Sequence, residues 1–237
     1  MSMRERERIE KFYQTFSKDK PANYWSLLNP TVLMGNHVRQ RELVKILNKI
    51  GNLSDKKILE IGCGYGGNLS ELIRFGANPS NLIGNDLMED RIAGCRRTLP
   101  SSVTLLYGDA LDLTIDDESL DVCYQSTVFT SIVNSDVKKQ LAEKMLRMCK
   151  PGGGILWFDF TYGNTGNVKG IKKSEIKKLF EGCNITFKRV HLYHWIGRAI
   201  QCIHPSLLYL TYPILHSIPL LRSHWICWIE KPIHNKK

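Results

Sequence analysis

A glycine-rich loop flanked by carboxylates is the part of the sequence whose residue types best suit ligand chemistry. Gly62, Gly64 and Gly67 satisfy G-x-G-x-x-G directly after an apolar run, and Glu60 stands two positions before the first glycine. Glycines at such a place allow a tight turn and let a ligand approach the backbone closely. Asp86 follows at about the distance expected of an acid that binds a ribose. The pattern predicts a site for a cofactor built on a nucleoside.

Glu60 discriminates between the two cofactors that this loop could accept. A dinucleotide would place its pyrophosphate beside the Glu60 carboxylate, and like charges at short distance repel strongly. S-Adenosylmethionine carries an ammonium and a sulfonium and has no phosphate, so an acid favours its binding. The charges therefore favour S-adenosylmethionine over a dinucleotide.

The elements around the loop follow one repeated pattern from about residue 56 to 160, in which a short apolar run, a turn and a segment of helical periodicity succeed one another. A parallel sheet with crossover helices requires this order. A helix capped by Asp136 is expected to place Val137, Leu141 and Met145 along one face. A further short helix is expected over 174–180. We expect strands at 58–61, 82–86, 103–107, 121–125, 154–160, 184–190 and 224–229.

Several motifs beyond the glycine loop resemble class I S-adenosylmethionine-dependent methyltransferases of the type 11/25-like group. They lie at 58–69, Asp86, 108–110, 121–126 and 148–153, in the order of that family, over about a hundred residues. The resemblance implies an α/β, Rossmann-like class I methyltransferase fold. Its seven-stranded sheet would be mostly parallel with the last strand antiparallel, and helices would cover both faces.

The resemblance also implies roles for residues at the methionine and ribose end of the cofactor. Glu60 would orient the methionine ammonium, and Gly62 and Gly64 would admit the methionine and ribose. Asp86 would accept hydrogen bonds from both ribose hydroxyls. Gln125 would line the methionine side.

At the adenine end, the resemblance assigns Asp109 to the adenine amino group and Ala110 to a backbone N–H contact. Leu87 would pack on the adenine ring. Asn85 departs from the apolar residue or Val commonly found before the ribose acid. Three further residues are assigned to the same cofactor site, namely Cys63, Asn68 and Arg91.

Four other stretches, at 125–132, 155–160, 168–171 and 220–225, resemble a narrower group of bacterial methyltransferases associated with surface-polysaccharide and related glycan biosynthesis. This resemblance implies O-methylation of a sugar, a phosphorylated sugar or a glycan-linked group. Small-molecule N- or O-methylation in other metabolism and RNA methylation are the alternatives. RNA is disfavoured because no N-P-P-Y-type motif follows the fourth strand. A non-enzymatic nucleotide-binding or membrane-associated scaffold is a further rival, and the intact cofactor residues argue against it.

Methyl transfer to a hydroxyl needs a base that takes the acceptor's proton. Asp159 is the first candidate because it ends the fifth strand, where ligands collect in an open α/β sheet. His37 and His194 are the other candidates. The alternative for Asp159 is a cap on a loop or helix, and for each histidine a structural or exposed position.

We expect two parts in the chain: an N-terminal helical lid or cap over 1–50, and a methyltransferase domain over 51–237 with an apolar insertion at about 191–223. Prolines interrupt 195–223, and its longest apolar run is too short to span a bilayer. A substrate lid or an oligomer contact is the favoured interpretation of this segment. A membrane-docking element, which would place the enzyme beside lipid-linked glycan, is the alternative.

The net charge of +10 favours an anionic partner, while nucleic acid is not expected. Seven scattered cysteines with no zinc-like spacing predict reduced, mostly buried thiols and no metal. The first 20 residues alternate Arg and Glu without an apolar core, which is unlike a secretory signal. These features predict a cytoplasmic protein, with peripheral contact at the inner membrane as the alternative.

Overall fold

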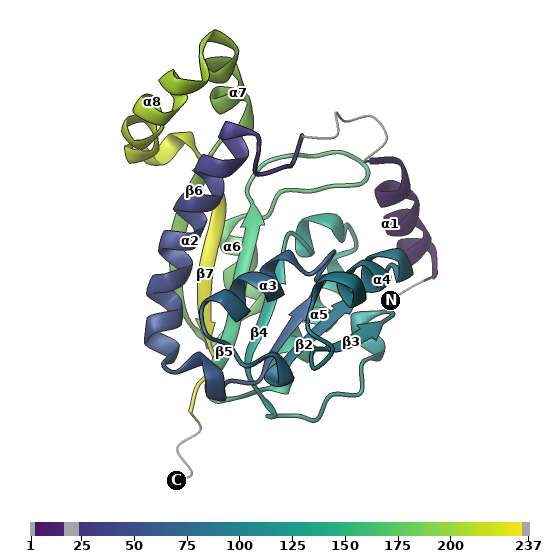
Figure 1. Cartoon of the computed structure of the whole chain (residues 1–237). Helices are drawn as coiled ribbons and strands as arrows, with labels where there is room; N and C mark the ends of the chain where they lie inside the picture. Colours follow the sequence, from purple (N-terminus) through teal and green to yellow (C-terminus); the bar gives the residue numbers. More distant parts are fainter. Residues whose placement is uncertain (1–2, 17–23, 234–237) are drawn as a thin grey trace.

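A seven-stranded sheet forms the centre of the chain, whose computed structural model describes residues 3–16 and 24–233 (Figure 1). The strand order is β3-β2-β1-β4-β5-β7-β6, and only β7 runs antiparallel to its neighbours. This is the predicted class I fold. The strands are β1 (Ile58–Ile61), β2 (Leu82–Asp86), β3 (Thr104–Tyr107), β4 (Leu120–Ser126), β5 (Cys149–Phe160), β6 (Asn184–Leu192) and β7 (Arg222–Glu230).

Helices cover both faces of the sheet and enclose two apolar cores. One core lies beneath α2, α3, α4 and α8, and the other lies beneath α5 and α6, with α1 at its margin. Because both faces are covered, every residue of β1 and β2 is buried. The helices are α1 (Met3–Phe16), α2 (Pro30–Ile50), α3 (Gly67–Arg74), α4 (Glu89–Thr98), α5 (Ser135–Met148), α6 (Lys173–Leu179), α7 (His194–Ile203) and α8 (Pro205–Ser217).

The helix α5 begins two residues earlier than the predicted cap would place it. The Asn134 side chain accepts hydrogen bonds from the backbone N–H groups of Asp136 and Val137, and Asn134 has an extended backbone. An N-cap residue must stand outside the helix in this conformation. The prediction of Asp136 as the cap was therefore wrong, and Asp136 instead lies in the first turn, where its charge complements the helix dipole.

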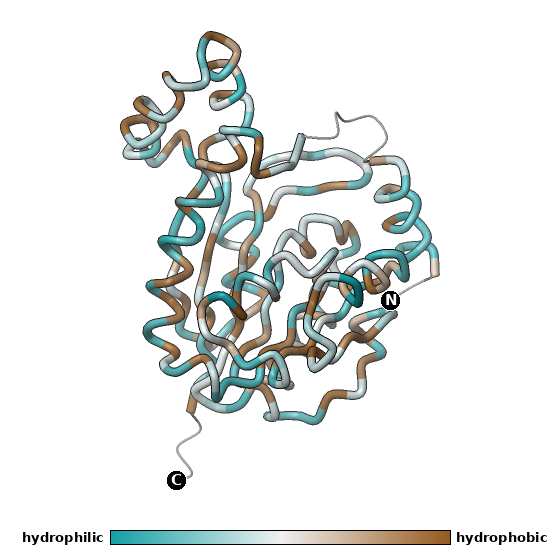
Figure 2. The backbone as a smooth tube through the Cα atoms, viewed as in Figure 1, coloured by the Kyte–Doolittle hydropathy of each residue, from teal (hydrophilic) through white to brown (hydrophobic). Residues whose placement is uncertain are grey.

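The segment 191–223 is mainly helical and projects from the carboxyl end of β6 (Figure 1). The helices α7 and α8 pack on α2 and β6 through a few buried residues such as Leu208 and Tyr212. Much of their apolar surface faces outward, and Figure 2 shows hydrophobic stretches along both helices. The exposed apolar side chains here are Trp195, Ile203, Leu207, Tyr209, Leu210, Ile214, Ile218 and Leu220.

The described part of the chain contains no helix with the length and hydropathy needed to cross a bilayer.

Candidate cofactor site

A cavity of about 410 Å³ lies at the carboxyl edge of the parallel strands. Its walls come from the loops after β1 and β4, the ends of β2 and β3, and α1. This is the edge at which ligands bind in open α/β sheets, because the strand ends there leave a crevice. The structure brings these predicted site residues together in the cavity wall: Gly62, Gly64, Asn68, Asp86, Leu87, Arg91, Asp109 and Ala110.

Glu60 lies behind the cavity wall and is completely buried. The amide Nδ2 of Asn68 donates a hydrogen bond of 2.6 Å to its Oε1 atom. Its Oε2 atom is buried and has no hydrogen-bond partner among the described residues. Burial raises the pKa of this carboxyl to about 8, and the Asn68 hydrogen bond opposes the rise. A cationic group placed beside Oε2 would satisfy the oxygen and hold the carboxylate ionised.

The loop after β1 depends on glycine at two of its positions. Gly62 and Gly64 have φ angles of +68° and +56°, a region that side chains disfavour. A Cβ atom on Gly62 would come within 2.4 Å of Val128 Cγ2, whereas one on Gly64 would meet open space. The loop is therefore shaped so that bare backbone borders the cavity at Gly64.

Asp86 is held in a fixed orientation at the end of β2. Its Oδ2 atom accepts a hydrogen bond of 2.9 Å from the Gly64 N–H, and Oδ1 accepts one of 2.9 Å from the Met88 N–H. The Arg91 guanidinium lies 3.6 Å from Oδ2. A carboxylate has lone pairs beyond these contacts, so Asp86 can still accept from hydroxyl groups in the cavity.

The far end of the cavity is built around Asp109, which caps the 3-10 helix η3 (Ala110–Asp112) through the Leu111 N–H. The Asn85 amide donates to the carbonyl oxygens of Leu106 and Gly108 at 3.1 and 3.0 Å. This explains a polar residue at a buried strand position: the amide ties β2 to the loop after β3 that presents Asp109 and Ala110.

Two residues of α1 complete the cavity wall, namely Ile9 and Tyr13. The Arg91 guanidinium lies 4.3 Å from the centre of the Tyr13 ring, and the Tyr13 hydroxyl shares a hydrogen bond of 2.7 Å with Ser131 Oγ. The sequence predicted only that Ile9 and Tyr13 belong to the N-terminal lid or cap over 1–50, without a place in the cofactor site. Their i, i+4 spacing on a polar helix was the available signal.

Two predicted cofactor residues, Gln125 and Cys63, lie behind the cavity wall. Gln125 Oε1 accepts from the Val128 N–H at 3.1 Å, and Nε2 donates to the Phe158 carbonyl oxygen at 3.4 Å. Gln125 thus braces the loop after β4, whose residues 126–128 line the cavity. Cys63 is buried beneath the glycine loop, and its Sγ would lie 3.1 Å from a Cβ atom on Gly84.

The three predicted base candidates lie apart, and none borders the cavity. Asp159 is fully buried and accepts from the Thr130 hydroxyl at 2.6 Å and the Thr130 N–H at 3.2 Å. Burial raises the pKa of Asp159 to about 7. His37 is exposed in a separate hollow between α2 and α8. His194 begins α7 and lies beside His191 and His224.

Residues 58–153 match a family described as a methyltransferase domain. The chain is 37% identical over 114 residues to the phthiotriol/phenolphthiotriol dimycocerosates methyltransferase 1 of Mycobacterium ulcerans, covering 47% of this chain and 40% of that protein. It is 32% identical over 109 residues to a fatty-acid O-methyltransferase of Mycolicibacterium smegmatis, covering 46% and 38%. The crystal structure of a SAM-dependent methyltransferase from Archaeoglobus fulgidus aligns with a TM-score of 0.57 at 17% identity, covering 84% of this chain and 98% of that one.

The sheet order and the aligned crystal structure define the class I methyltransferase fold, and residues 58–153 match the methyltransferase-domain family. The match to the family includes the loop after β1, the end of β2 and the loop after β3, all of which line the cavity. The matched region spans about two fifths of the length of the curated relatives.

Proposed function

We propose that this chain transfers the methyl group of S-adenosylmethionine to a hydroxyl oxygen of a lipid-linked acceptor. The buried Oε2 atom of Glu60, which has no hydrogen-bond partner in the described structure, supports S-adenosylmethionine as the methyl donor. A buried charge without a partner is strongly destabilising, so the site suits a ligand that brings a cation to it. The ammonium of S-adenosylmethionine is such a group.

The other polar groups of the cavity fit the remaining parts of that cofactor. Asp86 would accept from the ribose hydroxyls, and Asp109 from the adenine amino group. Leu87 and Ala110 offer apolar surface to the adenine. The cofactor supplies an electrophilic methyl group, which forms a bond to the acceptor oxygen as the bond to sulfur breaks. The protein's part is to hold the acceptor in line with that bond and to exclude water.

The exposed apolar surface of α7 and α8 supports an acceptor attached to lipid. A group of exposed apolar side chains on one part of a protein surface marks an interaction site. The chain's net charge of +10 suits an anionic bilayer surface. Two relatives are named for acceptors with long hydrocarbon chains, the dimycocerosates and fatty acids. A glycan carried on a lipid also agrees with the resemblance to polysaccharide-associated methyltransferases, so a lipid-linked glycan is the acceptor that unites these observations.

Among the predicted bases, His194 is the one that we propose acts on the acceptor. It is half-buried at the carboxyl edge of the sheet, where α7 begins. Asp159 instead has its oxygens engaged by Thr130 and by the Phe160 N–H, and we propose that it positions the loop after β4. His37 lies in the separate hollow between α2 and α8, so we do not propose it as the base.

The test is a methyl-donor consumption assay with S-adenosylmethionine and a panel of acceptors. The panel holds lipid-linked glycans, fatty acids, phosphorylated sugars, nucleotide sugars and bulk RNA. We expect turnover on lipid-linked acceptors that exceeds turnover on the water-soluble sugars. Turnover on RNA alone would overturn the acceptor class. Calorimetry that finds no affinity for S-adenosylhomocysteine, but tight binding of a nicotinamide or flavin dinucleotide, would overturn the methyltransferase itself.

A further inference from the structure

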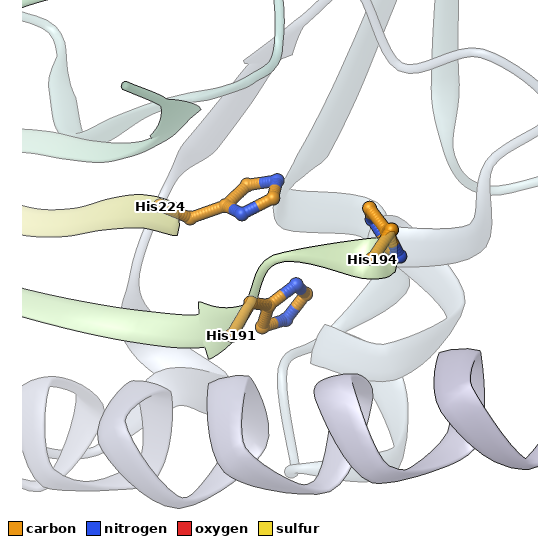
Figure 3. Close-up of side chains that lie close together, drawn as sticks. All are labelled: His191, His194 and His224. Carbon is orange, nitrogen blue, oxygen red and sulfur yellow. The ribbon is translucent and has the colours of Figure 1, made fainter. Parts of the chain in front are cut away.

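Three histidines from β6, α7 and β7 meet at the carboxyl edge of the sheet (Figure 3). His191 is the residue before the last in β6, His194 is the first residue of α7, and His224 is near the start of β7. One ring nitrogen from each lies within 4.8 Å of one from each of the others. His191 and His224 are buried, and His194 is half-buried. No other such group of metal-binding side chains occurs in the part of the chain that the structure describes.

Three of the six ring nitrogens in this cluster are buried and have no hydrogen-bond partner in the described structure. Both ring nitrogens of His191 and the Nδ1 atom of His194 are buried and unpaired within residues 3–16 and 24–233. Buried polar atoms in folded proteins are almost always paired with protein, water or a bound ion. Unpaired nitrogens that converge from three elements therefore point to a ligand that they share.

The backbone is distorted where it presents His191. This residue has a φ of +55°, which a side chain rarely adopts, and it lies between the paired positions Val190↔His224 and Leu192↔Arg222 without a partner of its own. The His191 ring lies against α2, where Gly35 leaves room: a Cβ atom there would lie 3.3 Å from His191 Nδ1. Backbone strain of this kind concentrates at functional sites.

Ser223 fixes the proton of the third histidine. Its hydroxyl oxygen lies 3.0 Å from the Leu192 carbonyl oxygen and 3.3 Å from that of His191, and donation of its one hydrogen to these carbonyls leaves the oxygen to accept the 2.8 Å hydrogen bond from His224 Nδ1–H. The proton on Nδ1 leaves the lone pair of His224 on Nε2, available for a ligand. A second hydrogen bond that sets the tautomer is typical of metal-binding histidines.

The cluster packs against a buried aromatic side chain. Phe158 lies 5.1 Å from the His224 ring and 5.2 Å from the His191 ring, and excludes water on that side. The nearest buried cation, Arg39, is paired with Glu71 at 2.8 Å.

We propose that His191, His194 and His224 bind one divalent transition-metal ion of the zinc type. Zinc bound tetrahedrally at 2.0–2.1 Å would hold the nitrogens about 3.3 Å apart. The ring nitrogens now lie within 4.8 Å of one another, and rotation of the imidazole rings would bring them to that distance. Three neutral ligands leave the ion its full charge and one coordination position, the arrangement of catalytic rather than structural zinc sites.

An acceptor hydroxyl would occupy the open position, and this part of the inference rests on the proposed function. A metal-bound oxygen loses its proton more readily, because the cation stabilises the alkoxide. The alkoxide oxygen then forms the bond to the methyl carbon, the carbon–sulfur bond breaks, and the proton passes to solvent. His194 would act on the acceptor through the metal rather than as a free base.

The binding test uses the tag-free full chain, dialysed against a chelator and titrated with Zn²⁺ in the absence of S-adenosylmethionine. We expect one zinc per chain, and with Co²⁺ the visible bands of a tetrahedral site. The variant His194→Ala should bind zinc at least about tenfold more weakly. His216→Ala is the matched control, since His216 is a half-buried histidine outside the cluster, and it should bind as wild type does.

Two outcomes would overturn the metal site: no saturable zinc uptake by the wild-type chain, or equal uptake by wild type and His194→Ala. Circular dichroism establishes that His194→Ala folds, and His224→Gln gives a second, conservative variant. Calorimetry with S-adenosylhomocysteine separates this inference from the proposed function, because zinc uptake does not require that cofactor to bind. Methyl transfer by His194→Ala at the wild-type rate would overturn the acceptor role of the metal.

Discussion

Asn68 donates a 2.6 Å hydrogen bond to Oε1 of Glu60, while Oε2 of the same carboxylate is buried without a partner in the described structure. Asn68 stands in the first turn of α3, and its hydrogen bond to Oε1 orients the Glu60 carboxylate. Since Asn68 also lines the cavity, the pair connects the buried charge of β1 to the ligand space. The contact thus positions a carboxylate for a cation that the protein itself does not supply.

The substitution Glu60→Gln should weaken S-adenosylmethionine binding by about 30-fold or more, or roughly 2 kcal/mol, because it removes one partner of a buried charge pair. The amide keeps the size of the side chain, so the fold should be retained. Isothermal titration calorimetry measures the change. Glu89→Gln, an exposed glutamate at the start of α4, is the control and should bind normally. Equal affinities of wild type and Glu60→Gln would remove Glu60 from the site.

Cofactor binding at pH 7 should release a proton. Burial raises the pKa of the free Glu60 carboxyl to about 8, so most molecules carry the proton at pH 7. The ammonium of the cofactor lowers that pKa, and the proton leaves as the pair forms. Calorimetry in phosphate and in Tris, whose ionisation enthalpies differ, should give different apparent enthalpies at pH 7. Identical enthalpies in the two buffers at pH 7 would contradict an ionised Glu60 in the complex.

Asp86 should show separable effects on cofactor binding and on stability. Asp86→Asn keeps one oxygen that can accept from Gly64 N–H or Met88 N–H, whereas Asp86→Ala leaves both donors unpaired. We expect both variants to lose measurable binding of S-adenosylmethionine. The alanine variant should also lose about 1–3 kcal/mol of stability for each unpaired donor, and the asparagine variant about half as much because it leaves only one donor unpaired. Chemical denaturation beside calorimetry tests this, and tight cofactor binding by either variant would contradict the ribose assignment.

Asp159 and Thr130 should behave as one unit. Their 2.6 Å hydrogen bond ties β5 to the 3-10 helix η4 (Phe129–Ser131), which follows the cavity-lining residues 126–128. Thr130→Val and Asp159→Asn should therefore each lower cofactor affinity and turnover together, by about tenfold. The measurement is Kd beside kcat for both variants. If Asp159→Asn loses turnover with unchanged Kd while Thr130→Val is normal, then Asp159 is the base after all.

The exposed apolar side chains of α8 should contribute most to membrane binding. The double variant Leu210→Ser and Ile214→Ser removes two exposed apolar side chains one turn apart and should weaken sedimentation with anionic vesicles by about tenfold or more. Ile233→Ser, an exposed apolar position just beyond β7, is the control. S-Adenosylmethionine affinity should stay unchanged in both. If the wild-type chain does not bind vesicles but forms a dimer, and the double variant does not form that dimer, then the surface is a protein–protein contact.

The sequence predicted the elements that carry local patterns. The glycine loop, Asp86 and Asp109 could be placed because each lies at or just after the end of a short strand, and strand ends of a parallel sheet meet at one edge. The strands themselves were found to within a few residues. At β5, β6 and β7 the structure adds residues at the ends, because pairing with a neighbour extends a strand beyond its apolar run.

The histidine cluster could not be predicted in this way. His191 and His194 are close in sequence, but His224 follows two helices and has no fixed spacing to them. Only the antiparallel pairing of β6 with β7 and the positive φ angle of His191 bring the rings together. For the same reason Asp159 was expected at an open strand end, whereas η4 covers it through Thr130. Contacts of this kind depend on the packing of elements and not on local periodicity.

The distribution of thiols gives this chain a natural attachment point for a spectroscopic probe. Five of its seven cysteines are buried, and Cys183 is half-buried, whereas Cys202 on α7 is exposed. Alkylating reagents attack the accessible thiolate, so a maleimide dye should label Cys202 first. A dye there sits on the same helical projection as Leu210 and Ile214, so its emission colour would report directly whether this projection enters a bilayer.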